Sequence, residues 1–234
     1  MTSAWTAFDS WMAERDPDFV PKAIAIIEVY LAPPTDGPTF CVDEKTAIGV
    51  RAPAAPSQPV APGQPARREF EYVRHGTADL LAAFEVGTGR VTGLIRRQHR
   101  SCEFLELLRV LDQQVPKRQV IHLILDPVKL HQSAEVALYI YHRPWRFQFH
   151  WLPTHASWLS FIEAWFAILS KKCLKRSEFA DFAAAERGIT DFIATYNAHQ
   201  AKPFIWRKGV KFYQRLKDKL AEQRHAATTL PEAA

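Results

Sequence analysis

The sequence is poor in cysteine: it contains only Cys41, Cys102 and Cys173, and no two of them are close together. An odd number of widely spaced cysteines without a CxxC pair argues against a disulfide framework and against a zinc knuckle. Long apolar runs are also missing, since none approaches the roughly 18 residues of a membrane span, and residues 1–19 do not resemble a signal peptide. We therefore expect a cytoplasmic protein that is neither secreted nor embedded in a membrane.

The signature motifs of several enzyme classes are absent as well. The chain has no glycine-rich phosphate loop, no GxSxG sequence of serine hydrolases and no HExxH sequence of zinc proteases. No motif therefore supports a mechanism that would compete with chemistry based on carboxylates.

The chain is moderately basic. Thirty Lys and Arg residues outnumber 25 Asp and Glu residues, which gives a formal charge of +5 and favours a polyanionic partner without requiring one. Dense basic clusters lie at 96–100, 171–176 and 207–219, and such clusters suit phosphate backbones. Each cluster taken alone is more often a solvated helix or loop face.

Apolar residues make up 47% of the chain, which is enough for a sizeable core. Their spacing predicts five strands, at 40–48, 79–86, 90–95, 120–125 and 147–152. The second and third strands form a hairpin around Gly87–Thr88–Gly89, and the fourth is apolar throughout, as in a strand buried on both faces. The proline-rich stretch 51–66 predicts an irregular loop or a ragged hairpin.

Helical spacing and capping residues predict helices within 5–32, at 104–111, from Ser133 to Tyr141, from Ser157 to about Leu174, and from about Glu178 to Asn197. This order of elements predicts an α/β fold in which several helices flank one mixed five-stranded sheet. We divide the chain into a helical lead-in at 1–36, a core domain at 37–206, and a basic C-terminal helix and tail at 207–234.

Asp126 closes the fourth predicted strand, at the edge where ligand sites of α/β sheets tend to lie. A carboxylate at the end of a buried strand needs a cation or hydrogen-bond partners, although Asp126 could equally start a turn with Pro127. Asp43 and Glu44 lie within the first strand and point to opposite faces, so at most one of them shares a site with Asp126. Local sequence does not choose between them. An alternative without a functional role explains the pattern as well: one carboxylate would lie in solvent and the other would pair with Lys45.

Glu163 lies on a polar or small stripe of an otherwise apolar helix, together with Ser160, Ala167 and Ser170. This stripe faces either water or the edge of the sheet, where it would leave room for ions and a DNA strand. Acidic side chains from two strands and a helix are what two-metal phosphoryl transfer requires, because carboxylate oxygens hold Mg²⁺ ions about 3.5–4 Å apart. Such ions activate the attacking oxygen and stabilise the departing one.

Several blocks in one order resemble a known family, the mariner-like DDE transposases of bacterial insertion sequences, specifically the insertion-sequence-630 group. These blocks, within 16–206, are Cys41–Lys45, Tyr72–Thr77, Leu123–Asp126 followed by His131, Pro153–Leu159 leading into Glu163–Phe166, and Tyr196–Asn197. The resemblance implies an RNase H-like fold in which Asp43, not Glu44, joins Asp126 and Glu163 as catalytic residues and ligands of two Mg²⁺ or Mn²⁺ ions.

The same resemblance implies a nucleoid-associated bacterial enzyme that nicks double-stranded DNA at transposon ends and transfers the 3′ hydroxyl into target DNA. A homodimer is the expected assembly. Candidate DNA contacts are Lys45, Arg74, His75, Lys171 and Lys172. Because family members carry helix-turn-helix domains ahead of the core and only 42 residues precede Asp43, a separately encoded helix-turn-helix polypeptide is an expected partner.

Two positions depart from the pattern of the family. Pro127 follows Asp126, and Ser160 stands three residues before Glu163, whereas the family usually has Asn at both positions. These departures support an alternative, a catalytically inactive DNA-binding remnant of a decayed element. A general RNase H-like nuclease that acts on RNA hybrids is a further alternative, because it would use the same carboxylates.

Overall fold

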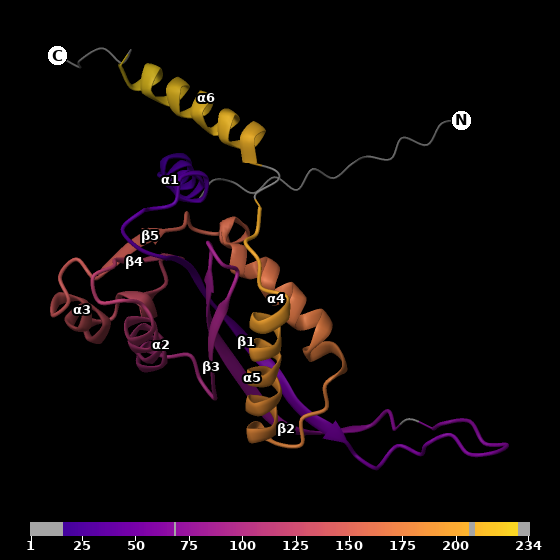
Figure 1. The fold of residues 1–234 in the computed structure, drawn as a ribbon. Coiled ribbons are helices and arrows are strands. Elements are labelled where there is room, and N and C mark those ends of the chain that lie inside the picture. The colour runs from indigo at the N-terminus through magenta and orange to yellow at the C-terminus, as the bar shows by residue number, and fades with distance from the viewer. Residues whose placement is uncertain (1–15, 68, 206–208, 229–234) are drawn as a thin grey trace, which may run out of the picture.

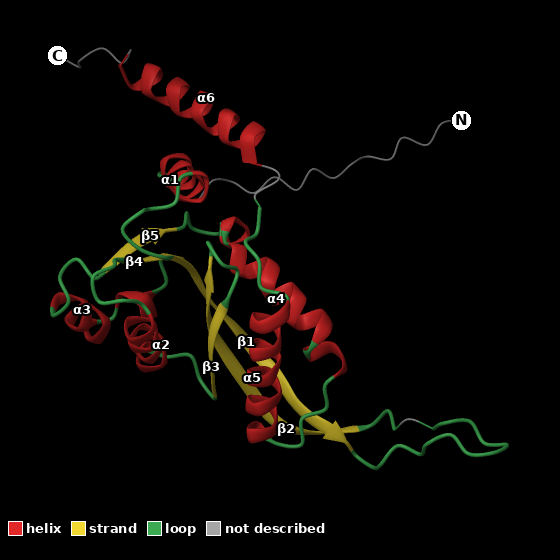
Figure 2. Cartoon of the chain, in the orientation of Figure 1, coloured by secondary structure: helices red, strands yellow, loops and turns green. Residues whose placement is uncertain are grey.

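Five strands form one mixed sheet in the computed structural model, which describes residues 16–67, 69–205 and 209–228 (Figures 1 and 2). The strands are β1 (Thr39–Pro53), β2 (Tyr72–Glu85), β3 (Val91–Arg96), β4 (Ile121–Leu125) and β5 (Phe147–Trp151). Their order across the sheet is β3-β2-β1-β4-β5. Neighbours among β1, β2 and β3 are antiparallel, whereas β4 runs parallel to both β1 and β5. The predicted mixed five-stranded sheet is confirmed.

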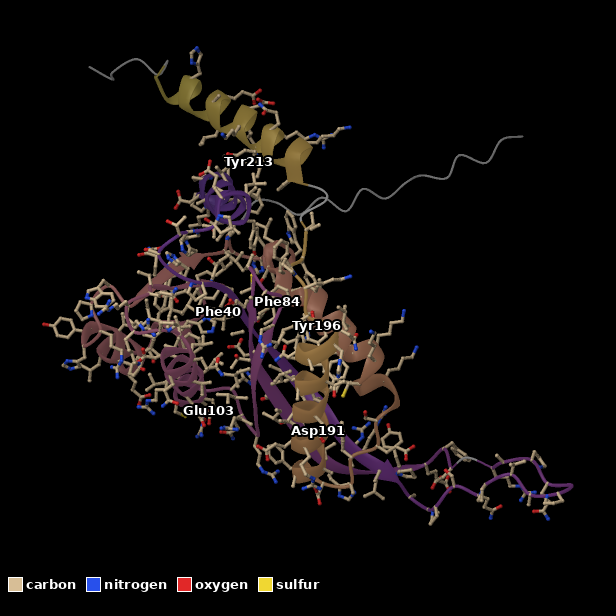
Figure 3. All side chains as sticks on the ribbon, in the orientation of Figure 1. Phe40, Phe84, Glu103, Asp191, Tyr196 and Tyr213 are labelled. Carbon is tan, nitrogen blue, oxygen red and sulfur yellow. The ribbon has the colours of Figure 1, made fainter. Side chains whose placement is uncertain are left out.

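Helices cover both faces of the sheet (Figure 1). Helices α2 (Ser101–Gln114) and α3 (Ala134–Tyr141) pack on one face, and α1 (Phe19–Leu31), α4 (Phe161–Lys172) and α5 (Phe182–His199) pack on the other. Helix α6 (Gly209–Thr228) lies outside these layers against α1, where the Tyr213 hydroxyl donates to Glu28 at 2.7 Å (Figure 3). The predicted division of the chain into three segments stays a prediction.

Alternation along β1 sends neighbouring side chains into two different apolar clusters. Phe40 and Val42 belong to the cluster beneath α2 and α3, whereas Cys41 belongs to the cluster beneath α4 and α5. Phe40 and Phe84, one from each cluster, both lie near the centre of the molecule (Figure 3). Because strand side chains alternate, Asp43 follows Cys41 toward α4, and Glu44 follows Val42 toward α2.

Strands β1 and β2 continue into an arm, formed by residues 54–67 and 69–71, that projects away from the body of the molecule (Figure 1). Its two sides are linked by isolated bridges, Gln58 with Arg67 and Ala61 with Gln64. The prediction of an irregular loop or a ragged hairpin at 51–66 is therefore confirmed beyond Pro53, where the regular strand ends.

A β-bulge interrupts β1 immediately after the acidic pair. The pairing of β1 with β2 shifts between Lys45 and Ile48, and Ala47 adopts a left-handed conformation with φ of 55°. The buried Asp79 holds this bulge, because its Oδ1 accepts a hydrogen bond from the backbone N–H of Ala47 at 2.8 Å. Bulges redirect side chains, and this one changes the register of β1 against β2 immediately after Lys45.

The predicted start of the fourth helix, with Ser157 as its cap, is wrong by three residues. Ser157–Leu159 forms a 3₁₀ turn, and α4 begins at Phe161 with Ser160 in the cap position. The turn is held from outside, since the Tyr30 hydroxyl donates to the Leu159 carbonyl at 2.9 Å. That contact spans 129 residues of sequence and is therefore invisible to capping rules.

The remaining helix predictions agree with the structure except at their ends. The helix predicted from about Glu178 begins at Phe182, because the Asp181 carboxylate caps it by accepting from the Ala184 N–H at 2.7 Å. Within the predicted 5–32 segment, the structure confirms α1 at Phe19–Leu31. Residues 5–15 of that segment lie outside the described part of the chain.

Candidate active site

The parallel pairing of β1 with β4 brings Asp43 and Asp126 to the same edge of the sheet. Cys41 pairs with Ile124 in this ladder, and two further residues along each strand lead to Asp43 and Asp126. Asp126 is the first residue after β4, and its side chain is 38% exposed. The site therefore lies at the carboxyl end of β4, as ligand sites of parallel strands commonly do.

Glu163 enters from the first turn of α4, on the face of the sheet toward which Asp43 points. Ile162 and Trp165 of this helix are fully buried in the same cluster as Cys41, which leaves Glu163 on an exposed side of the helix. Tyr30 fixes the entry of the helix, since its ring stacks on Phe161 at 4.2 Å in addition to its bond to the Leu159 carbonyl.

Asp126 and Glu163 both contribute to the electrostatic environment of Asp43. Burial raises the pKa of Asp43 to about 7, and the negative charges of Glu44, Asp126 and Glu163 raise it too, against a hydrogen bond from the Glu44 N–H at 2.7 Å. Because Asp126 and Glu163 both act on the pKa of Asp43, the three acids that the sequence singles out lie near one another. No ion pair with Asp43 occurs within 16–67, 69–205 and 209–228, so its charge lacks a protein cation.

The donors of this site are suited to a hard divalent cation. All three are carboxylates, the ligand type that Mg²⁺ and Mn²⁺ prefer, and a cation would relieve the repulsion that raises the pKa of Asp43. In the described part of the chain, no three His, Cys, Asp or Glu side chains already form a tight metal-binding cluster. Binding an ion would therefore require the carboxylates to turn inward.

Glu44 belongs to a different set of contacts on the opposite face of the sheet. Its Oε1 lies 3.1 Å from Nε2 of His131, and the two side chains are 9% and 0% exposed. Nδ1 of His131 lies 3.3 Å from Oδ1 of Asp126. Burial lowers the pKa of His131, but hydrogen bonds to Asp126 and Glu44 outweigh it and raise the pKa to about 9. The alternative in which Lys45 pairs with one acid of the strand is therefore wrong.

Two of the five candidate DNA contacts line one groove, of about 450 Å³, at the root of the arm. Lys45 and Arg74 line it together with Arg51, so its three charged residues are all cations. Arg51 and Arg74 both lie over the ring of Tyr72, at 4.9 and 5.7 Å from its centre. Arg51 and Tyr72 were not among the predicted DNA contacts. The sequence signal for Tyr72 is its place two residues before Arg74.

The other candidate contacts lie elsewhere. His75 is exposed on β2, and Lys171 and Lys172 are exposed in the last turn of α4. Lys172 Nζ donates to the side-chain carbonyl of Gln200 at 2.5 Å. The groove at the root of the arm therefore contains only part of the predicted set.

The sheet order, the flanking helices and the acidic edge define a domain of the nuclease and transposase type. A family model described as DDE superfamily endonuclease matches residues 38–185, and the chain belongs to this family. The matched region contains Asp43, Asp126 and Glu163.

Solved structures of the Mos1 mariner transposase are similar in fold. A pre-cleavage transpososome has a TM-score of 0.57 and 16% identity, over 95% of this chain and 66% of that chain. A paired-end complex with Mn has a TM-score of 0.56 and 16% identity, over 91% and 64%. The isolated Mos1 catalytic domain has a TM-score of 0.55 and 12% identity, over 91% and 97%.

These matches confirm the RNase H-like fold that the sequence resemblance implied. This chain spans only 64% of the chain in the paired-end complex with Mn. No curated protein matches the sequence. None of the described helices is long and apolar enough to cross a membrane.

The raised pKa of Asp43 predicts an unusual dependence of stability on pH. The folded state holds the Asp43 proton more tightly than the unfolded state, where the ordinary value is 3.8. The free energy of unfolding therefore falls as pH rises from about 4 through about 7, because ionising Asp43 costs more in the folded state than in the unfolded state. Asp43→Asn removes this cost and should raise the free energy of unfolding at pH 8 by up to about 4 kcal/mol, and by less at pH 4.5.

Urea unfolding without divalent cations at both pH values measures this difference. Asp191→Asn, which changes an exposed carboxylate on α5, is the control and should have little effect at either pH. Equal unfolding free energies for Asp43→Asn and the unchanged protein at pH 8 would contradict the strained carboxylate.

Proposed function

We propose that this chain is the catalytic core of a DNA transposase of the insertion-sequence-630 group, with Asp43, Asp126 and Glu163 as its metal-binding and catalytic residues. The observation that carries the proposal is that Asp126 and Glu163 lie close enough to the buried Asp43 to act on its charge, within a DDE superfamily endonuclease domain. In the proposed reaction the attacking group comes from water or from a DNA hydroxyl.

The proposed reaction has two phosphoryl-transfer steps. In the first, water attacks a phosphorus atom at the transposon end, the bond to the 3′ oxygen breaks, and a free 3′ hydroxyl and a 5′ phosphate remain. In the second, that 3′ hydroxyl attacks a target phosphodiester, and the target strand releases its own 3′ oxygen. The role of the protein would be to align the attacking and departing oxygens on opposite sides of the phosphorus.

Asp43, Asp126 and Glu163 would hold two Mg²⁺ or Mn²⁺ ions. Bound there, the ions would supply charge stabilisation for the attacking oxygen, the departing oxygen and the transferring phosphoryl group. Support comes from the all-oxygen donor set and from the fold shared with a Mos1 paired-end complex that contains Mn.

The proposed partners are double-stranded transposon ends and target DNA. The similar Mos1 structures include a pre-cleavage transpososome and a strand transfer complex, and their fold supports the same class of substrate here. We propose a homodimer as the working assembly and a separately encoded helix-turn-helix polypeptide as the source of end recognition.

A second candidate is a DNA-binding protein that has lost cleavage. Pro127 lacks a backbone N–H beside Asp126, and Ser160 is buried, with its side chain beside the Cys41 thiol. In the resembling family both positions usually carry Asn, whose amide would offer donors near the carboxylates. This candidate predicts DNA binding without nicking. The general RNase H-like nuclease predicts a preference for RNA hybrids over duplex DNA.

Nicking of end-containing duplex DNA tests the proposal directly. The protein should nick in the presence of Mn²⁺ or Mg²⁺ and not with a chelator, and Asp126→Ala should lower the rate at least a hundredfold. Asp191→Ala, an exposed acid outside the site, should retain the full rate. Equal rates for the unchanged protein and Asp126→Ala would reject the assigned triad, and binding without nicking would favour the second candidate.

DNA affinity at several salt concentrations tests the cationic groove. Removing Lys45 and Arg74 together should weaken duplex binding and reduce the slope of log K against log salt by about 0.9 for each lost phosphate contact. Fluorescence anisotropy measures both quantities. The control is Arg109→Ala, because Arg109 is also exposed and lies over a tyrosine ring, at 5.8 Å from Tyr139, but on α2. The same loss in both variants would contradict a specific groove.

A further inference from the structure

His131 occupies a position that packing and hydrogen bonding determine completely. It lies in a 3₁₀ turn at Lys129–Gln132, five residues after Asp126, and its side chain is 0% exposed. Its ring lies 4.4 Å from the fully buried ring of Phe104 on α2. Between that ring and the sheet, the imidazole has little freedom to rotate.

The partners of His131 are all hydrogen-bond acceptors. Nδ1 lies 3.0 Å from the backbone carbonyl of Asp126 and 3.3 Å from its Oδ1, and Nε2 lies 3.1 Å from Oε1 of Glu44. A ring nitrogen must carry a proton to satisfy an acceptor, so both nitrogens donate in this arrangement. The imidazole thus donates to Glu44 on one side and to the backbone carbonyl of Asp126 on the other, with the Asp126 carboxylate within ion-pair distance of Nδ1.

A comparison of the two aspartates shows why Asp126 needs this donor. The carboxylate of Asp43 accepts a hydrogen bond from the N–H of the next residue, Glu44, at 2.7 Å. Asp126 cannot be held in the same way, because the next residue is Pro127 and proline has no N–H. Among the described residues, His131 is the one side chain that forms an ion pair with the Asp126 carboxylate.

We propose that His131 is the positioning residue of Asp126. Its Nδ1–H takes the place of the backbone N–H that Pro127 lacks, and Glu44 holds His131 in position. Engaging Oδ1 would fix the rotamer of Asp126 and leave its other oxygen to face Asp43 and Glu163. This inference rests on the proposed function, because it assumes that Asp126 binds a cation. Glu44 would then be the anchor of the positioning residue and not a cation ligand.

The strength of this effect follows from general behaviour of metal sites. Hydrogen-bond partners that orient a ligand typically change metal affinity by about 10-fold to 100-fold when they are removed. Loss of His131 should have an effect of that size on Mn²⁺ binding. Because Glu44 acts one step further away, Glu44→Gln, which can still accept from His131, should have a smaller effect.

The test is calorimetric titration of the full chain with Mn²⁺ alone, together with thermal unfolding of each variant. His131→Leu should bind Mn²⁺ at least 10-fold more weakly. His131→Asn, whose amide can still donate toward Asp126, should bind nearly as tightly as the unchanged protein even if its melting temperature falls. Restoring an N–H at the exposed residue 127, by adding Pro127→Ala to His131→Leu, should recover part of the affinity.

A second buried histidine provides the matched control. His122 is 7% exposed and bridges Asp36 at 2.9 Å and His150 at 3.0 Å, near the start of β4 and away from Asp126. His122→Asn should change the melting temperature but not the affinity for Mn²⁺. A merely structural role for His131 predicts that affinity follows the melting temperature in all variants and that neither Asn nor the restored N–H rescues it.

The outcomes separate the inference from the proposed function. Tight Mn²⁺ binding by the unchanged protein, with equal affinity in folded His131→Leu, overturns the positioning role and leaves the proposed function standing. Absence of Mn²⁺ binding in the unchanged protein overturns both. Weaker binding in His131→Leu that Asn and Pro127→Ala rescue supports both.

Discussion

The site depends on the accumulation of negative charge at one edge of the sheet. The parallel pairing of β1 with β4 places Asp43 beside Asp126, and the packing of α4 on the same face adds Glu163. Burial raises the pKa of Asp43, and repulsion from the neighbouring carboxylates raises it further. The rest of the fold, including the Tyr30 contacts at the start of α4, holds this arrangement against the repulsion.

Strand alternation gives the two adjacent acids of β1 opposite environments. Glu44 points toward α2, where the buried His131 neutralises it. Asp43 points toward α4, where its neighbours within the described structure are further carboxylates and no cation pairs with it. Glu44 lies on the face of the sheet away from Glu163, whereas Asp43 points toward α4, the helix that carries Glu163. This placement is the physical ground for proposing Asp43, and not Glu44, as the ligand.

Much of the fold could be predicted from the sequence, because its strands and helices carry local signals. The apolar run of β4, the glycine-containing turn between β2 and β3, and the cap at Ser133 each identify an element without reference to the rest of the chain. The start of α4 was misplaced at Ser157, although Ser160 with Glu163 three residues later fits the capping-box pattern better. The structure has Ser160 in the cap position, and a hydrogen bond from the distant Tyr30 holds the 3₁₀ turn before it.

The site was only partly predictable, for the same reason. Period-two alternation shows that Asp43 and Glu44 face opposite sides of the sheet, but it does not identify the residues that each of them contacts. The answer depends on His131, which is 87 residues from Glu44 in sequence and reaches it only through the fold. The cationic groove could not be predicted for the same reason. Arg51 of β1 meets Tyr72 of β2 only because these two strands pair at the root of the arm.

The proposed function requires that Asp43, Asp126 and Glu163 bind divalent cations jointly. Anomalous X-ray scattering from crystals of the chain soaked in Mn²⁺ measures this most directly. We predict manganese peaks whose nearest protein atoms are oxygens of all three carboxylates. Manganese peaks confined to other parts of the molecule, with these carboxylates turned away from one another, would contradict it.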